Sequence, residues 1–140
     1  MPASPLASLS PRGLVAETTL AAYEEADLDR IARYYAPDAT YHGAAGRVGD
    51  REALADNVAH VTSAIASLET TVEETVTDGL EVAFRYTIGG RHVGPLQGMR
   101  PTYEAFETQG IGLLRHDGAA VREVHFVFDL LGVRTQLGGL

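Results

Sequence analysis

The first half of the chain carries hydrophobic residues at the three- and four-residue spacing typical of amphipathic helices. This spacing predicts a helix over about 12–26 and a shorter one over 28–36, which Asp27 can cap and Pro37 ends. A third helix is expected after Asp50, which can cap it. Its apolar residues form a single stripe: Leu54, Val58, Val61, Ile65 and Leu68.

The second half changes to the alternation of hydrophobic and polar residues that marks strands with one buried face. Asp78-Gly79 and the turn at 116–118 are hairpin signals between such runs. Helices followed by an antiparallel meander predict an α+β domain with its helices on one face of a curved sheet. The predicted strands are 39–43, 70–77, 80–88, 106–115 and 121–129. The Gly/Pro-rich connection 89–105 and the Gly-rich segment after Asp129 carry no predicted element.

Length and charge narrow the class of protein. The 140 residues suit one domain, with a flexible tail over 1–11 and a folded domain over 12–140. Nineteen acidic residues against eleven arginines give a formal charge of −8, which argues against a nucleic-acid or anionic-membrane partner. No signal peptide or membrane-spanning run is apparent, so we expect a cytoplasmic protein.

Missing residue types exclude several chemistries. The sequence has no lysine, which excludes a lysine Schiff base, and no cysteine, which excludes thiolate nucleophiles and disulfides. No two histidines have metal-ligand spacing on one predicted element, and no phosphate-binding glycine loop opens a helix. We therefore expect neither a metal nor another cofactor.

Four segments resemble one known family: 23–41, GGRHVGPLQGMRPT at 89–102, GIGLLRHDG at 110–118, and 129–138. Across Leu14 to Gly138 the chain resembles the SnoaL-like polyketide cyclases. The resemblance implies a cone-shaped α+β barrel of the nuclear transport factor 2 type, whose curved antiparallel sheet packs three N-terminal helices on its concave face. It also implies a ligand pocket between the two layers, and a homodimer or homotetramer.

The sequence departs from the family at the positions that carry its aldol chemistry. The resemblance implies an aspartate base on the last strand, a histidine on the strand before it, and an asparagine on the first strand. Phe126, Gly112 and Tyr41 stand at these positions. We therefore expect no aldol mechanism, an apolar pocket floor at Phe126, and a pocket widened at Gly112. A glycine bend of the sheet is the other interpretation of Gly112.

Four residues remain as candidate catalytic groups: Tyr41, Tyr86, His125 and Asp129. A tyrosine hydroxyl can donate a proton or hydrogen bond to an oxyanion or an opening epoxide. His125 and Asp129 lie four residues apart on one predicted strand, which suits proton transfer. The alternatives are a packing role for either tyrosine and a structural role for Asp129 at the end of the strand.

The predicted substrate-binding residues are Tyr35, His92, Met99, Gly112 and Phe126. Tyr35 lies on the apolar stripe of the second predicted helix. His92 and Met99 belong to the 89–102 segment, where His92 either gates the pocket mouth or anchors the loop.

Together these observations predict a cofactor-free cyclase or isomerase of polyketide-type natural-product biosynthesis, such as antibiotic formation. It would bind a polyketide-like small molecule in an apolar pocket and close a ring by acid/base catalysis, through epoxide opening or conjugate addition. Two alternatives stay open. One is an epoxide hydrolase or hydroxylase-type member of the same family, with a water held by Asp38, Glu104 or Glu107. The other is a non-catalytic small-ligand-binding module, which the apolar Phe126 favours.

Overall fold

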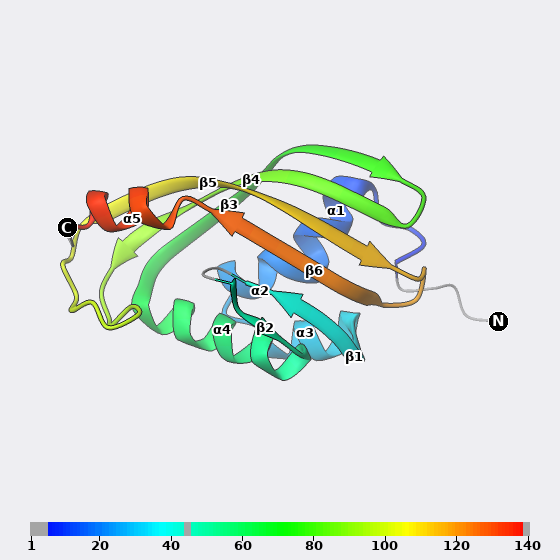
Figure 1. Cartoon of the computed structure of the whole chain (residues 1–140), viewed down its shortest axis with the longest axis horizontal. Coiled ribbons are helices and arrows are strands. Elements are labelled where there is room, and N and C mark those ends of the chain that lie inside the picture. The colour runs from blue at the N-terminus through cyan, green and yellow to red at the C-terminus, as the bar shows by residue number, and fades with distance from the viewer. Residues whose placement is uncertain (1–5, 44–45, 139–140) are drawn as a thin grey trace.

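The computed structural model describes residues 6–43 and 46–138. One curved, open sheet of six strands arches over a layer of helices (Figure 1). The strands are β1 (Tyr35–His42), β2 (Val48–Gly49), β3 (Ile65–Asp78), β4 (Glu81–His92), β5 (Ala105–His116) and β6 (Val121–Phe128). The helices are α1 (Pro11–Val15), the π-helical turn η1 (Ala16–Leu20), α2 (Ala21–Glu24), α3 (Leu28–Tyr34), α4 (Arg51–Ala64) and α5 (Leu130–Gln136). The predicted α+β architecture is confirmed.

The strand order is β2-β1-β6-β5-β4-β3, and the meander from β3 to β6 is antiparallel throughout. The sheet as a whole is mixed, however, because β1 pairs with β6 in parallel, with His42 opposite His125. The expectation of a wholly antiparallel sheet was wrong at this one pairing. Hydrophobic alternation shows which face of a strand is buried, but it carries no information on the direction of its partner.

Several segments differ from their predicted boundaries. The second predicted helix, 28–36, ends at Tyr34, and Tyr35 already belongs to β1, so Tyr35 lies on a strand and not on the apolar stripe of a helix. The apolar stripe of α4 continues in sequence through Ile65 and Leu68, yet both residues belong to β3. Inward-facing residues of the strand happen to continue the helical spacing across the junction. The C-terminal segment, to which no element was assigned, forms α5, because Asp129 caps it by accepting a hydrogen bond from the Gly132 amide at 2.8 Å.

The described part of the expected N-terminal tail packs on the domain. Leu6 is buried in the core, and Ser10 caps α1 through a hydrogen bond from the Gly13 amide at 3.0 Å. Residues 1–5 of the expected tail lie outside the described residues. The helix predicted over 12–26 is continuous from α1 to α2, with η1 as a π-helical turn in its middle.

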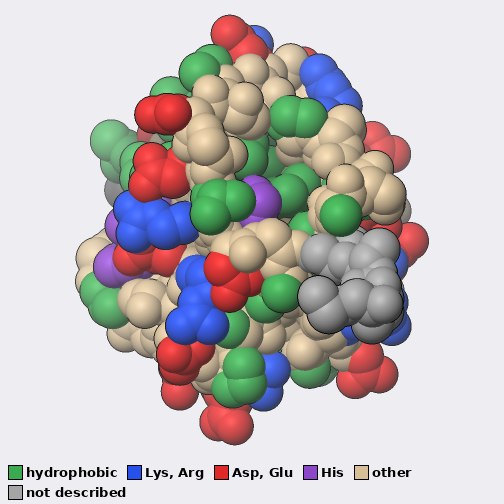
Figure 2. All heavy atoms as spheres, turned by 90° about the vertical axis from the view of Figure 1, so that its right-hand side faces the viewer, with side chains coloured by type: hydrophobic (Ala, Val, Ile, Leu, Met, Phe, Trp, Pro, Cys, Tyr) green, Lys and Arg blue, Asp and Glu red, His purple; other side chains and the backbone are tan. Residues whose placement is uncertain are grey.

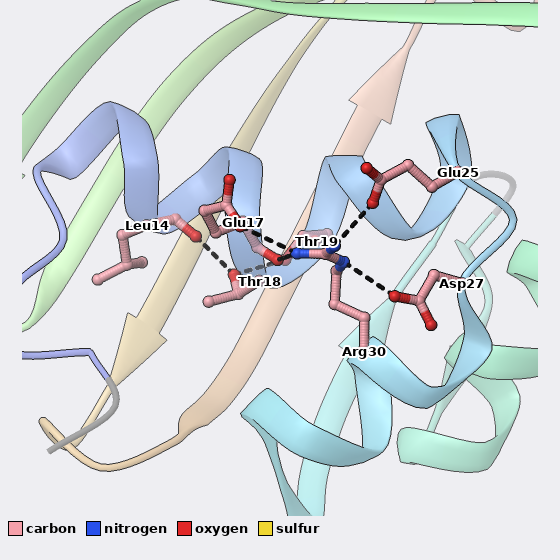
Figure 3. Close-up of polar contacts among 7 residues, drawn as sticks. All are labelled: Leu14, Glu17, Thr18, Thr19, Glu25, Asp27 and Arg30. Atoms are coloured by element: carbon pink, nitrogen blue, oxygen red, sulfur yellow. Dashed lines mark hydrogen bonds and ion pairs between the residues drawn. The ribbon is translucent and has the colours of Figure 1, made fainter.

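An arginine holds the helical layer together (Figure 3). From α3, the guanidinium of Arg30 contacts the carboxylates of Glu17 at 3.0 Å, Glu25 at 2.7 Å and Asp27 at 3.4 Å. It also donates to the backbone carbonyl of Glu17 at 3.0 Å, on the π-helical turn. The side chain of Arg30 is 13% exposed, so these contacts fix α3 against the preceding helix and thereby position β1, which follows α3 directly.

Charged side chains of both signs are interspersed on the face that Figure 2 shows, without a continuous basic patch. Within the described residues, no helix is long and apolar enough to cross a membrane.

Candidate functional site

A cavity lies between the helices and the inner face of the sheet, which is the face that the helices cover. It holds about 820 Å³ of empty space, its open mouth included. The lining residues are Leu20, Tyr23, Tyr41, Asn57, Val61, Ile65, Tyr86, Ile88, Leu96, Gln97, Phe106, Thr108, Phe126, Phe128, Leu130 and Val133. None of these described residues is charged or a histidine, so the cavity suits a neutral and largely apolar ligand.

Phe126 lies at the centre of an aromatic cluster in this cavity. Its ring meets Tyr23, Tyr41 and Tyr86 edge-on, with centroids 6.5, 6.3 and 6.1 Å away. Such edge-to-face contacts are favourable in themselves and hold each ring at a defined angle. Three tyrosines from η1–α2, β1 and β4 therefore surround an apolar residue at the place where the resemblance implies an aspartate.

The three tyrosine hydroxyls differ in their hydrogen bonding. The Tyr23 hydroxyl donates to Asn57 Oδ1 at 2.6 Å. Those of Tyr41 and Tyr86 make no hydrogen bond to any residue that the structure describes, and both residues line the cavity. Burial raises the pKa of Tyr41 and of Tyr86 above the ordinary value of a phenol. Both groups consequently keep their protons at neutral pH and act as hydrogen-bond donors.

Gly112 does not widen the cavity, contrary to the expectation from the sequence. A side chain at this position would contact the ring of Phe84 from the neighbouring strand, which already occupies the space. At Gly110 the ring of Tyr86 is accommodated in the same way. Both glycines therefore make room for aromatic rings on β4 rather than for a ligand.

His125 and Asp129 are not brought together with the tyrosines. Phe126 points into the cavity, so its neighbour His125 points to the outer face of β6, where its ring stacks on His42. The Asp129 carboxylate caps α5 and does not line the cavity. This geometry matches the structural alternative for Asp129.

The remaining predicted substrate-binding residues lie around the cavity but not on its wall. The Tyr35 hydroxyl is buried against Thr19 Oγ1 at 2.6 Å. His92 is fully buried and accepts the Thr102 amide on Nδ1 at 3.2 Å, which matches the loop-anchor alternative. Met99 pairs through its backbone with Leu96, and it is Leu96 that reaches the cavity.

The acids considered for water activation do not line the cavity either. Asp38 pairs with Arg122 at 2.9 Å on the exposed surface, and neither Glu104 nor Glu107 is among the lining residues. A carboxylate-held water at the reacting position has no support in the described part of the chain.

Asn57 was not among the residues predicted for the site, and Tyr23 was predicted only as part of a helix. A signal for Asn57 was present, because it falls three residues after Leu54 and four before Val61. It is thus a polar residue on the apolar face of a helix, the kind of residue that must find a partner when buried. Its partner is the Tyr23 hydroxyl.

A curved, open sheet with helices on its inner face and an apolar cavity between the layers is the architecture of the nuclear transport factor 2-like α+β proteins. The sequence profile of the SnoaL-like polyketide cyclases matches residues 13–137, and the chain belongs to this family.

Several solved structures are similar to this chain. TsrD from Streptomyces laurentii is 26% identical, with a TM-score of 0.77 and coverage of 86% of this chain and 90% of TsrD. IdmH from Streptomyces antibioticus, assigned as a polyketide cyclase, is 25% identical, with a TM-score of 0.80 and coverage of 92% and 99%. AclR from Streptomyces galilaeus, assigned as a hydroxylase, is 22% identical, with a TM-score of 0.80 and coverage of 95% and 88%; it shows the fold alone. No curated protein matches the sequence.

Proposed function

We propose that this protein is a cofactor-free cyclase or isomerase that closes a ring in a neutral polyketide-type substrate. The observation that carries the proposal is a pair of phenols, Tyr41 and Tyr86, whose hydroxyls make no hydrogen bond to a described residue, in a cavity with no charged lining residue among those described. The assignment of the similar protein IdmH as a polyketide cyclase supports the substrate class.

The cavity favours ring closures that need hydrogen-bond donation more than a strong base. In an epoxide opening, a hydroxyl of the substrate attacks an epoxide carbon and the carbon–oxygen bond of the epoxide breaks. One phenol donates its proton to the leaving oxygen and regains a proton from the attacking hydroxyl. In a conjugate addition the same donors stabilise the enolate oxygen.

Shape contributes independently of proton transfer. The rings around Phe126 are held at fixed angles, so a flexible chain bound among them is restricted to few conformations. Holding reacting groups close together in this way can lower a barrier by several kcal/mol, with an upper range of about 7–11 kcal/mol.

The test compares the metabolites of a strain that lacks the gene with those of its parent, by mass spectrometry. The proposal expects a compound to accumulate with the same mass as the lost product. Re-introduced Tyr41→Phe and Tyr86→Phe variants should each restore less product than the wild-type gene. Tyr103→Phe is the matched control, because Tyr103 is 63% exposed and does not line the cavity.

Three results would contradict the proposal. A mass difference of one water between the accumulated and the lost compound indicates a hydrolase or dehydratase. Full product from the Tyr41→Phe and Tyr86→Phe double variant removes the donor role of the phenols. An unchanged metabolite profile favours the ligand-binding module.

A further inference from the structure

Three potential metal ligands meet on the outer face of the sheet, on the side opposite the cavity. The parallel pairing of β1 and β6 sets His42 directly beside His125. Glu123 lies two residues before His125 on β6 and so points to the same face. One ring nitrogen of His42, one of His125 and a Glu123 carboxylate oxygen all lie within 4.8 Å of one another.

The carboxylate of Glu123 is oriented toward the two imidazoles. Its Oε2 atom lies 3.1 Å from His42 Nε2 and 3.6 Å from His125 Nε2. Its Oε1 atom faces Arg115 Nη1 at 3.4 Å, and Arg115 is itself held by Glu81 at 2.6 Å. Oε1 of Glu123 is therefore engaged by Arg115, and Oε2 remains available to the two histidines.

We propose that His42, Glu123 and His125 bind a divalent transition-metal ion of the zinc type on the outer face of the sheet. Two imidazole nitrogens and one carboxylate oxygen are ligands that such ions accept. Bonds of about 2.0–2.2 Å place neighbouring ligand atoms roughly 3–3.5 Å apart, close to the two distances from Glu123 Oε2. The coordination positions left over are taken by water or by another ligand.

Both imidazole rings must turn before they can bind one ion. The imidazole rings of His42 and His125 are stacked, with centroids 3.9 Å apart and planes 4° from parallel. A metal ion lies in the plane of each imidazole that binds it, so the two rings must turn until their planes intersect. The side chains are 30% and 38% exposed, which leaves them room to turn outward.

The experiment titrates the full chain, without a histidine tag, with zinc chloride in a calorimeter at neutral pH. We expect about one ion per chain and a rise in the thermal unfolding midpoint on adding zinc. His42→Gln, His125→Gln and Glu123→Gln should each weaken binding about tenfold or more, since even losses outside the ligand set cost about 10–100-fold.

Two other histidines serve as controls. His60 accepts the Gln97 amide and His116 accepts the Gly118 amide, so both are imidazoles engaged elsewhere. His60→Gln and His116→Gln should bind zinc as the wild type does. NMR of the imidazole nitrogens supplies a direct readout, because zinc should shift Nε2 of His42 and His125 and leave His60 unchanged.

The proposal is overturned if the wild type binds no zinc, or if the His42→Gln/His125→Gln double variant keeps the wild-type affinity. Unfolding midpoints measured with a chelator show whether a variant has lost its fold. Where a variant has lost its fold, the NMR titration of the wild type with zinc tests the proposal in its place. None of these results depends on the proposed ring closure, since the cluster and the cavity lie on opposite faces of the sheet.

Discussion

The chemistry of the cavity is set by a small number of side chains whose polar atoms are donors. Phe126 takes the position where the resemblance implies an acid, and the phenols of Tyr41 and Tyr86 are protonated at neutral pH, as ordinary phenols are, with burial raising their pKa further. Tyr23 is already engaged with Asn57. Substrate recognition therefore depends on hydrogen bonds to carbonyl, hydroxyl or epoxide oxygens and on contact with aromatic rings.

Gly110→Ala should move the ring of Tyr86. A methyl group at Gly110 would lie 2.6 Å from the Tyr86 hydroxyl and Cζ, closer than such atoms can approach, so the ring must shift. Overpacking of this kind costs about 1–3 kcal/mol of unfolding free energy. We expect that loss in urea unfolding, together with reduced product formation. Gly112→Ala would displace Phe84, which packs on Phe126 and Tyr86, and would press on the backbone carbonyl of His125, so it should disturb the same aromatic cluster. Wild-type product formation by Gly110→Ala would show that the position of the Tyr86 ring is unimportant.

Among the elements, α5 begins at the Asp129 cap and is tied to β5 by Gln136, whose side-chain amide accepts from the Glu107 amide and donates to the Glu107 carbonyl, both at 2.9 Å. It carries Leu130 and Val133 to the cavity, and Asp129 begins it. Asp129→Ala should cost about 1 kcal/mol and weaken product formation through the loosened helix. Asp129→Asn keeps an N-cap of similar quality and should stay close to the wild type in both respects. If Asp129→Asn folds normally but forms no product, the carboxylate has a role in proton transfer. Chemical unfolding and product yield measured on the same preparations separate these cases.

The contacts of Arg30 predict a sharp difference between two substitutions. Arg30→Lys keeps the positive charge but cannot contact Glu17 and Glu25 with separate nitrogens of one planar group. Arg30→Met also removes the charge. We expect both to be destabilised, with a loss of about 1–3 kcal/mol for the methionine variant and less for the lysine variant. Unfolding titrations at low and high salt check this, because only the charged pairs are screened. Equal stability of all three proteins would contradict the structural role of Arg30.

Much of this architecture could be predicted because it follows from hydrophobic patterns within short stretches of the sequence. The helical spacing before Ala64 and the alternation after it follow from which face each element buries. The pairing of β1 with β6 joins residues distant in sequence, so nothing near His42 indicates that His125 is its neighbour. For the same reason the sequence did not predict the cluster of His42, Glu123 and His125. Alternation places Tyr86 on the inner face, and the family resemblance places Tyr41 and Phe126 there; the catalytic or binding roles of all three stay predictions. The site was missed where a partner across the molecule decides, as for Gly112 and Asn57.

At the scale of the whole molecule, buried phenols predict how stability depends on alkaline pH. Burial raises the pKa of Tyr23, Tyr35 and Tyr86 in the folded chain, whereas in the unfolded chain they release protons near pH 10. Above about pH 10 the unfolded state therefore binds fewer protons than the folded state, and the free energy of unfolding falls as pH rises. Below that pH these groups are protonated in both states and contribute no pH dependence.

Denaturant midpoints measured across this range, together with the absorbance of the phenolate form, check the prediction. Tyr35→Phe removes one buried phenol and should make the decline less steep. Ionisation of all six tyrosines while the fold remains intact would be the opposite result.

The parallel pairing of β1 with β6 also has a consequence for how the chain reaches this fold. His42 and Glu123 meet across 81 residues, whereas each hairpin of the meander joins strands that are adjacent in sequence. Closing so long a loop costs entropy that the shorter hairpins do not. The meander can therefore assemble first, and β1 docks onto an edge that exists only once β6 is in place. Until then that edge of β6 has unpaired backbone groups, so a chain whose β1 has not yet docked is vulnerable to association with other chains along this strand.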